Sequence, residues 1–321
     1  MAGGPSTPQL AAAVSEAGGL GFLAAGYKTP DAVRADLAAA QRLTNRPVGL
    51  NLLSVVERPV DHDAVARYAE TLRPEAKRYG VALGEPRFDD DHRAEKLALA
   101  AEERVAVVSF AFACPSADEI AALHDAGADV WVTVTEPHEA VIAADAGADA
   151  LVVQGAEAGG HRGTFDDADG AGATGLLDLL PRVAVETDLP LVAAGGIMDR
   201  ADAAAALAAG AVAVQAGTAF MLCPEAGTSA PHRALMRTAT DTALTRAFTG
   251  RRARGIVNRF MREHEADAPA AYPHVHALTA PLRAAARDAG DPDAMHLWAG
   301  TGFRRARPVA ARTVVEELAR R

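Results

Sequence analysis

The sequence predicts an α/β fold: a TIM-type (β/α)8 barrel whose first strand is missing from this chain, with a small helical subdomain near the C-terminus. Short apolar segments alternate with helical segments, a pattern typical of a parallel sheet covered on both faces. The tetrapeptide AGAD occurs at 126–129 and again at 146–149, which is the spacing that a repeated strand–helix unit needs. The chain has 321 residues, half of them apolar, enough for one large α/β domain or two smaller ones.

Local signals predict the individual elements in order. Thr7 and Pro8 indicate the start of a first helix, because threonine caps helix N-termini and proline suits the first helical position. Residues 54–103 are long, polar and charged, and we interpret them as helices and loops at one end of the barrel. The predicted strands cover residues 19–24, 48–53, 105–112, 129–135, 149–155, 189–196 and 211–217. The predicted barrel helices cover residues 8–17, 29–43, 118–126, 136–146, 199–209 and 308–321.

Seven predicted strands are one fewer than this type of barrel contains. Residues 1–4, MAGG, have the composition of a loop that follows a strand, so we expect the missing strand to precede Met1. We assign residues 1–222 and 301–321 to the barrel. Residues 223–300 contain several prolines and are interpreted as a helical subdomain that covers the mouth of the barrel and its substrate.

Composition and charge exclude several classes of function. The formal net charge is -10 and no basic stripe dominates, which argues against a nucleic-acid or anionic-membrane partner. Arg251, Arg252 and Arg254 form a short basic cluster, interpreted as a solvated, salt-bridged face. The two cysteines, Cys114 and Cys223, have no metal-ligand spacing. No apolar run reaches transmembrane length, so we expect a cytoplasmic protein without a metal.

Glycines at the ends of the last two strands predict a phosphate site. Gly195 and Gly196 end the strand at 189–196, and Gly217 and Thr218 follow the last strand. Neighbouring loops of a barrel lie side by side, so their backbone N–H groups and the helix that begins at Asp199 can bind an anion together. Ordinary tight turns are the alternative interpretation.

A second group of residues predicts the rest of a ligand site at the barrel mouth. Polar side chains end three other strands, and the backbone of the MAGG loop lies at the same end; these residues are Ala2, Gly3, Asn51, Thr133, Thr135 and Gln154. Each could singly be an ordinary inward polar residue, but together they favour a flat ligand with donors and acceptors along one edge. The loop after Gln154 contains Gly159 and Gly160, which would let the backbone pass close to such a ligand.

His161 ends this loop and is the candidate general base, because an imidazole titrates near neutral pH. A flexible turn with an exposed histidine is the alternative. Glu157 is a weaker candidate for orienting the loop. The other nine histidines lie in polar or helical segments and are interpreted mainly as surface residues: His62, His92, His124, His138, His232, His264, His274, His276 and His296.

The sequence resembles the nitronate monooxygenase family over nearly its whole length. The segments that carry this resemblance are MAGGPSTP (1–8), GGLGFLAAGY (18–27), GLNLL (49–53), VVSFAF (107–112), TVT (133–135), VVQGAEAGGHRG (152–163), AAGGI (193–197) and GTAFMLCPEAG (217–227). The most specific of them is QGAEAGGH (154–161).

The resemblance implies an FMN held non-covalently, with its phosphate on Gly195, Gly196, Gly217 and Thr218. Its ring would lie near Ala2, Gly3, Asn51, Thr133 and Gln154. His161 falls on the catalytic histidine of the family. It would take the α-proton from a nitroalkane or position a nitronate, and with dioxygen the products would be a carbonyl compound and nitrite.

Other functions remain open on the same sequence. An FMN-dependent NAD(P)H reductase, acting on an enoyl-ACP or a quinone, would use the same scaffold. A phosphosugar isomerase or aldolase would require a barrel lysine or paired carboxylates at strand ends, which we do not find. A flavin-binding protein without turnover is a third alternative. The oligomeric state is open, with a homodimer as one option.

Overall fold

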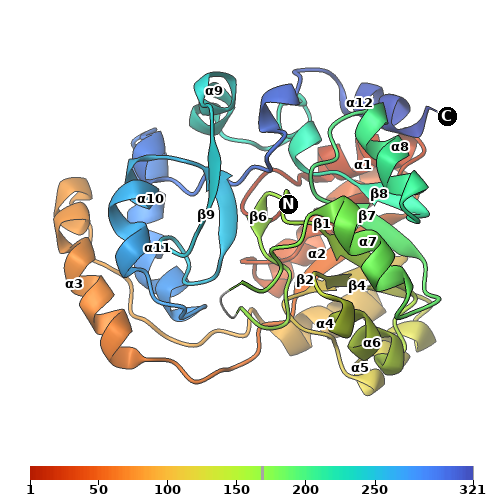
Figure 1. The fold of residues 1–321 in the computed structure, drawn as a ribbon, viewed down its shortest axis with the longest axis horizontal. Coiled ribbons are helices and arrows are strands. Elements are labelled where there is room, and N and C mark those ends of the chain that lie inside the picture. The colour runs from red at the N-terminus through yellow and green to blue at the C-terminus, as the bar shows by residue number, and fades with distance from the viewer. Residues whose placement is uncertain (168–169, 321) are drawn as a thin grey trace.

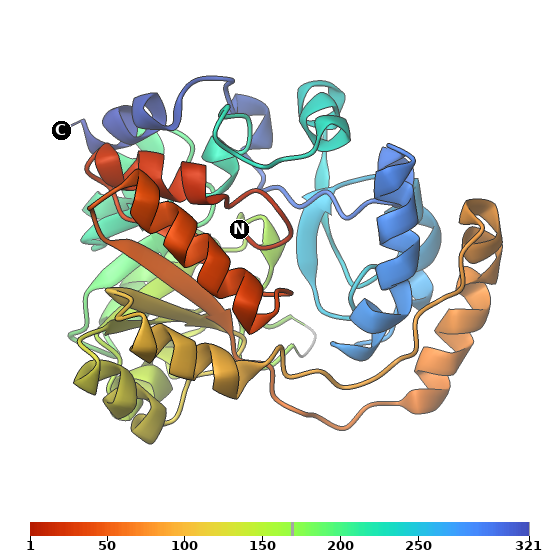
Figure 2. The ribbon, with the colours of Figure 1, turned by 180° about the vertical axis from the view of Figure 1, so that it is seen from behind.

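The computed structural model describes residues 1–167 and 170–320 and consists of a barrel-like part and a lobe (Figure 1). The barrel-like part is a curled parallel sheet with helices on its outer side, and Figure 2 shows it from behind. The lobe lies beside the sheet and contains most of the segments coloured blue, with one orange helix, whereas the dark blue helix at the C-terminus lies on the barrel-like part. Among the described residues, no helix is both long and apolar enough to cross a membrane.

The sheet contains seven parallel strands in sequential order. Six of the seven have mostly buried residues, whereas the short last strand is partly exposed. The strands are β1 (Gly21–Ala24), β2 (Val48–Leu53), β3 (Val107–Ala111), β4 (Asp129–Val134), β5 (Ala150–Gln154), β7 (Leu191–Ala194) and β8 (Ala213–Gln215). All seven predicted strands are confirmed, most of them with shorter bounds.

The sheet does not close into a complete barrel within the described residues. Its order runs from β1 at one edge to β8 at the other, and no ladder joins these two edge strands. The predicted fold, a TIM-type barrel that lacks one strand, is therefore confirmed. Helices α1 (Pro8–Glu16) and α12 (Ala311–Ala319) contact each other.

Helices cover the outer face of the sheet. The hydroxyl of Thr7 accepts a hydrogen bond from the N–H of Leu10 at 3.0 Å, so the predicted cap of the first helix is present. The helices of this layer are α1 (Pro8–Glu16), α2 (Pro30–Leu43), α4 (Arg93–Glu102), α5 (Ala117–Asp125), α6 (Pro137–Ala146), α7 (Leu176–Ala184), α8 (Arg200–Ala208) and α12 (Ala311–Ala319). The six predicted barrel helices are all among them.

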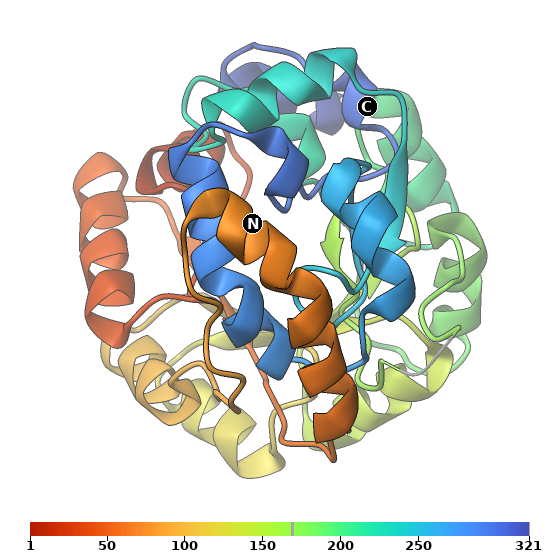
Figure 3. The same ribbon diagram turned by 90° about the vertical axis from the view of Figure 1, so that its left-hand side faces the viewer.

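The lobe has its own apolar core and differs from the prediction in two respects. First, it contains an antiparallel sheet in the order β6 (Gly160–His161), β10 (Ala253–Ile256) and β9 (Thr242–Thr245). Second, α3 (His62–Tyr79) packs in this core across α11, as Figure 3 shows. The remaining elements are α9 (Ala230–Thr238), α10 (Arg259–His264), α11 (His274–Asp288), and the short 3-10 helices η1 (Thr218–Phe220), η2 (Glu265–Asp267), η3 (Pro292–Ala294) and η4 (Phe303–Arg305).

Strand β6 connects the two parts at the carboxyl end of the parallel sheet. It follows β5 of the barrel in sequence and pairs with β10 of the lobe, with His161 opposite Ala253. The lobe therefore lies against the ends of the strands from which the predicted site residues come.

Candidate active site

A cavity of about 860 Å³ opens inside the curled sheet and reaches the lobe. Its wall also includes Phe22 of β1 and Val214 of β8, so it continues into the gap between the two edge strands. The predicted site residues that line it are Ala2, Asn51, Thr133, Gln154, Gly159, Gly160, His161, Gly195, Gly196, Gly217 and Thr218. Gly3 is not part of this wall; a Cβ atom on it would lie 3.7 Å from Nε2 of His296.

Two glycine loops form one end of the cavity. Gly195 and Gly196 have φ angles of 104° and 74°, a left-handed region that favours glycine. Within the described residues, the backbone N–H groups of Gly195, Gly196, Gly217 and Thr218 donate to no protein acceptor. These free donors border the cavity, where an anion can accept from them.

The N-terminus of α8 does not contribute to this end, contrary to the sequence-based expectation. The side chain of Asp199 accepts hydrogen bonds from the N–H groups of Ala201 and Asp202, and Arg305 binds the same aspartate at 2.8 Å. Because a carboxylate already caps the helix, its N–H groups are not available to a second anion.

Polar side chains of β2, β4 and β5 form the middle of the cavity. The amide of Asn51 donates to the hydroxyl of Ser109 at 2.9 Å. Gln154 accepts from the N–H of Gly163 at 2.9 Å and donates to the carbonyl of His161 at 3.2 Å, so it holds the loop that carries the histidine. Thr135 is not in the cavity wall: it is buried and donates to Glu139 at 3.0 Å.

Glu157 fixes the same loop from its outer side. Its carboxylate accepts from the N–H of Leu176 at 3.0 Å, at the start of α7, and its backbone carbonyl accepts from the N–H of Thr301 at 3.0 Å. This geometry agrees with the loop-orienting role considered for Glu157.

The imidazole of His161 lies among aromatic rings at the junction of barrel and lobe. Its centroid is 5.7 Å from Phe112, 5.9 Å from Tyr272 and 5.4 Å from Trp298. Its Nε2 atom lies 2.9 Å from Oγ1 of Thr249. Burial, followed by the nearby positive groups, holds the pKa of His161 well below its usual value, so the ring is neutral at pH 7.

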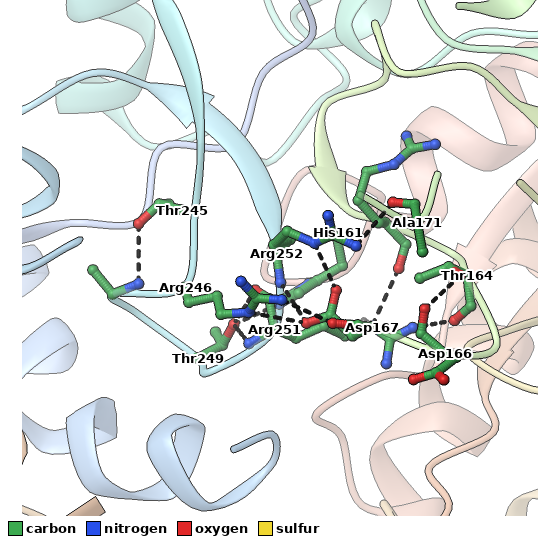
Figure 4. Close-up of polar contacts among 12 residues, drawn as sticks. His161, Thr164, Asp166, Asp167, Ala171, Thr245, Arg246, Thr249, Arg251 and Arg252 are labelled. Atoms are coloured by element: carbon green, nitrogen blue, oxygen red, sulfur yellow. Dashed lines mark hydrogen bonds and ion pairs between the residues drawn. The ribbon is translucent and has the colours of Figure 1, made fainter. Parts of the chain in front are cut away.

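Buried arginines fasten the segment that follows His161, as Figure 4 shows for Arg251 and Arg252. The guanidinium of Arg251 donates to the carbonyl of Arg162 at 3.2 Å and lies 4.0 Å from the ring centroid of Phe112. Arg252 pairs with Asp167 at 3.0 Å. Arg251 and Arg252 are only 6% and 9% exposed, so the expected solvated face is wrong for them. They are buried because the loop after His161 passes over them and offers carbonyl and carboxylate acceptors.

The expected surface position is also wrong for several histidines. His232, His264 and His274 are buried. His276 and His296 are half-buried, with His276 stacked on Tyr27 at 4.4 Å and His296 5.5 Å from Trp298. The remaining four, His62, His92, His124 and His138, are exposed as expected.

Several residues at this site were not predicted. Tyr27, Phe112 and Trp298 line the cavity, and Tyr272 and Thr249 contact His161. Phe112 directly follows β3, so its place at a strand end was a usable signal. The two that contact His161 come from the lobe, and nothing in the local sequence indicates which barrel residue they meet.

The model of the family described as nitronate monooxygenase matches residues 1–320. The chain belongs to the nitronate monooxygenase family. A nitronate monooxygenase from Pseudomonas aeruginosa is 41% identical over 98% of this chain and 93% of its own length. A probable nitronate monooxygenase from Bacillus subtilis is 36% identical over 95% of this chain and 88% of its own length. The family is flavin-dependent and consists of oxidoreductases, so this member is an enzyme of that class.

Solved structures of similar proteins agree with this family membership. A nitroalkane oxidase from Streptomyces ansochromogenes has 50% identity and a TM-score of 0.96, covering 99% of this chain and 92% of that one. FabK from Thermotoga maritima has 27% identity and a TM-score of 0.75, covering 99% of this chain and 89% of that one. The family and the nearer structure support the oxidation of nitronates as the reaction class.

Proposed function

We propose that the protein binds FMN non-covalently in this cavity and uses dioxygen to oxidise alkyl nitronates and nitroalkanes to a carbonyl compound and nitrite. The observation that carries the proposal is the convergence of three features on one cavity. The free N–H groups of the glycine loops lie at one end, polar strand ends lie in the middle, and His161 borders the lobe.

The residues present fit FMN. A cavity of about 860 Å³ is within the size range of cofactor sites. The N–H groups of Gly195, Gly196, Gly217 and Thr218 lack protein acceptors within the described residues, and a phosphate would satisfy them. The backbone of Ala2 and Gly3, with Asn51, Thr133 and Gln154, would bind the ring, and Gly159 and Gly160 would let the loop approach it. When bound, the flavin supplies an electron acceptor that dioxygen reoxidises.

His161 acts as the base in this proposal. Its pKa is low because the ring is buried near Arg251, His276 and Arg283, so it is unprotonated and can accept a proton at neutral pH. Proton loss from a nitroalkane creates a nitronate anion, which the guanidinium groups of Arg251 and Arg283 stabilise. The negative charge of that anion also raises the pKa of the imidazole while it holds the proton.

The lobe would cap the substrate, as the sequence also suggested. Trp298 comes from the lobe, and Phe112 comes from the end of β3; both line the cavity beside His161. Their rings offer apolar contact to an alkyl chain and limit the access of water.

Turnover without a nicotinamide tests the function. The purified protein should show the visible spectrum of oxidised flavin, and it should consume dioxygen and release nitrite when only ethylnitronate is added. An NAD(P)H-dependent reductase would instead need the nicotinamide for any turnover. Flavin reduction by NADPH, with no nitrite formed from ethylnitronate, would overturn the proposal in favour of that alternative.

A further inference from the structure

We propose that Thr249 is a positioning residue that fixes the tautomer of His161, so that Nδ1 is the nitrogen that accepts the substrate proton. The inference rests on the proposed role of His161 as the base. It adds which ring nitrogen reacts and which residue of the lobe selects it.

Thr249 reaches His161 from the turn between β9 and β10, as Figure 4 shows. Its side chain is almost fully buried, with 1% of the residue exposed. The distance from Oγ1 to Nε2 of His161 is 2.9 Å, which is an ordinary hydrogen bond. A threonine hydroxyl can either donate to an unprotonated Nε2 or accept from a protonated one.

The carbonyl of Arg251 decides between these two cases. The hydroxyl of Thr249 lies 3.1 Å from this oxygen, and Arg251 is buried. Within the described residues, no other group donates to this carbonyl. A buried carbonyl without a donor is costly. The hydroxyl of Thr249 therefore donates its single proton to the carbonyl of Arg251.

The lone pairs of the hydroxyl then remain as acceptors. The N–H of Arg251 approaches one at 3.4 Å, and Nε2 of His161 must donate to the other. His161 is therefore the Nε2–H tautomer, with an unprotonated Nδ1. Within the described residues Nδ1 has no hydrogen-bond partner, and it is not among the polar atoms closed off from solvent. It is the nitrogen left free for the substrate.

This arrangement also suits the product of proton transfer. An imidazolium donates from both nitrogens, so the bond from Nε2 to Thr249 persists after Nδ1 takes the proton. The opposite tautomer would lose its proton-accepting nitrogen to Thr249 and leave the Arg251 carbonyl without a donor.

The direct test is ¹⁵N NMR of the histidine rings in the flavin-loaded enzyme, labelled on histidine, with His161 assigned by its loss in His161→Asn. The correlation pattern separates the two neutral tautomers. We expect the Nε2–H form in the wild type, retained in Thr249→Ser and lost or mixed with the Nδ1–H form in Thr249→Val. An Nδ1–H form in the wild type would overturn the inference without any variant.

Kinetics gives the second readout. A general base accelerates a reaction by roughly 10²–10⁴-fold. Loss of the orientation of His161 in Thr249→Val should therefore lower kcat/KM for nitroethane by about tenfold or more. Thr249→Ser should restore most of it. Equal kcat/KM in the wild type and Thr249→Val, with full flavin content, would refute the positioning role. Absence of wild-type turnover on nitroethane and ethylnitronate would refute the proposed function instead, while the tautomer remains measurable.

Discussion

Asp91 accepts a hydrogen bond from the backbone N–H of Tyr27 at 2.9 Å, and both residues have φ angles in the left-handed region, 61° and 67°. Lys96, whose side chain is 1% exposed, lies 2.8 Å from the other carboxylate oxygen of Asp91. The ring of Tyr27 stacks on His276 and lines the cavity. A buried ion pair of the barrel therefore holds a strained tyrosine at the border with the lobe.

Asp91→Asn should destabilise the protein by about 3–5 kcal/mol, because it leaves Lys96 buried without its counter-charge. Denaturant unfolding with flavin bound measures the change. Asp125→Asn is the matched control, since Asp125 is exposed at the end of α5, and it should stay within about 0.5 kcal/mol of the wild type. Equal stability of the two variants would show that the buried pair does not hold this region.

Gly195→Ala should weaken FMN binding by roughly tenfold or more. The backbone of Gly195 is in the left-handed region, with φ 104°, and a Cβ atom there would lie 3.1 Å from the N atom of Ala158. This position is beside the proposed phosphate site. Gly210→Ala is a close control, because Gly210 has φ 106° while its Cβ meets nothing. Both variants carry a similar backbone strain of about 1–2 kcal/mol, and the close contact at Ala158 adds to the cost of Gly195→Ala, so its thermal stability should fall at least as far as that of Gly210→Ala. Fluorescence titration of FMN should separate them, and equal FMN affinity would contradict the phosphate assignment.

Stability should fall as the pH drops below about 6.5. Burial lowers the pKa of His232 to about 4 and that of His276 to about 3, and it also lowers that of His161. Between pH 6.5 and these values the unfolded chain binds more protons than the folded one, so the free energy of unfolding decreases with falling pH. Each such histidine lowers the free energy of unfolding by up to about 1.4 kcal/mol for each unit that the pH falls in this range.

Urea unfolding at pH 7.5, 6.5 and 5.5 measures this slope. His232→Asn should flatten it, whereas His138→Asn should not, because His138 is exposed. A free energy of unfolding that does not change between pH 7.5 and 5.5 would contradict the buried, neutral state of these rings.

Barrel elements were predictable because their signals are local. Continuous apolar runs such as residues 48–53 mark buried parallel strands, and Thr7 with Pro8 marks a helix start. Gly195 and Gly196 were identified for the same reason, since they directly follow a strand, and His161 was identified because it ends the glycine-containing loop that begins after Gln154. Their convergence on one cavity follows from the barrel geometry alone.

The lobe could not be derived in this way. Helix α3 packs against α11, about two hundred residues later in the chain, and nothing local indicates that partner. Thr249 meets His161 because β6 pairs with β10, and Tyr272 lies beside them because the N–H of Ala271 donates to the carbonyl of Gly250 in the same turn. Arg251 looked like a surface cation because its acceptors are backbone carbonyls of Arg162 and Thr164, which no side-chain pattern reveals.

Anaerobic mixing of the flavin-loaded protein with a nitro compound tests the central claim most directly. Nitroethane should reduce the flavin of the wild type, seen as loss of its visible absorbance. His161→Asn should retain its flavin, but nitroethane should reduce it roughly 10²–10⁴-fold more slowly. Because ethylnitronate needs no proton abstraction, the rate at which it reduces the flavin should fall less in the same variant. Reduction of His161→Asn by nitroethane at the wild-type rate would contradict the assignment of His161 as the base.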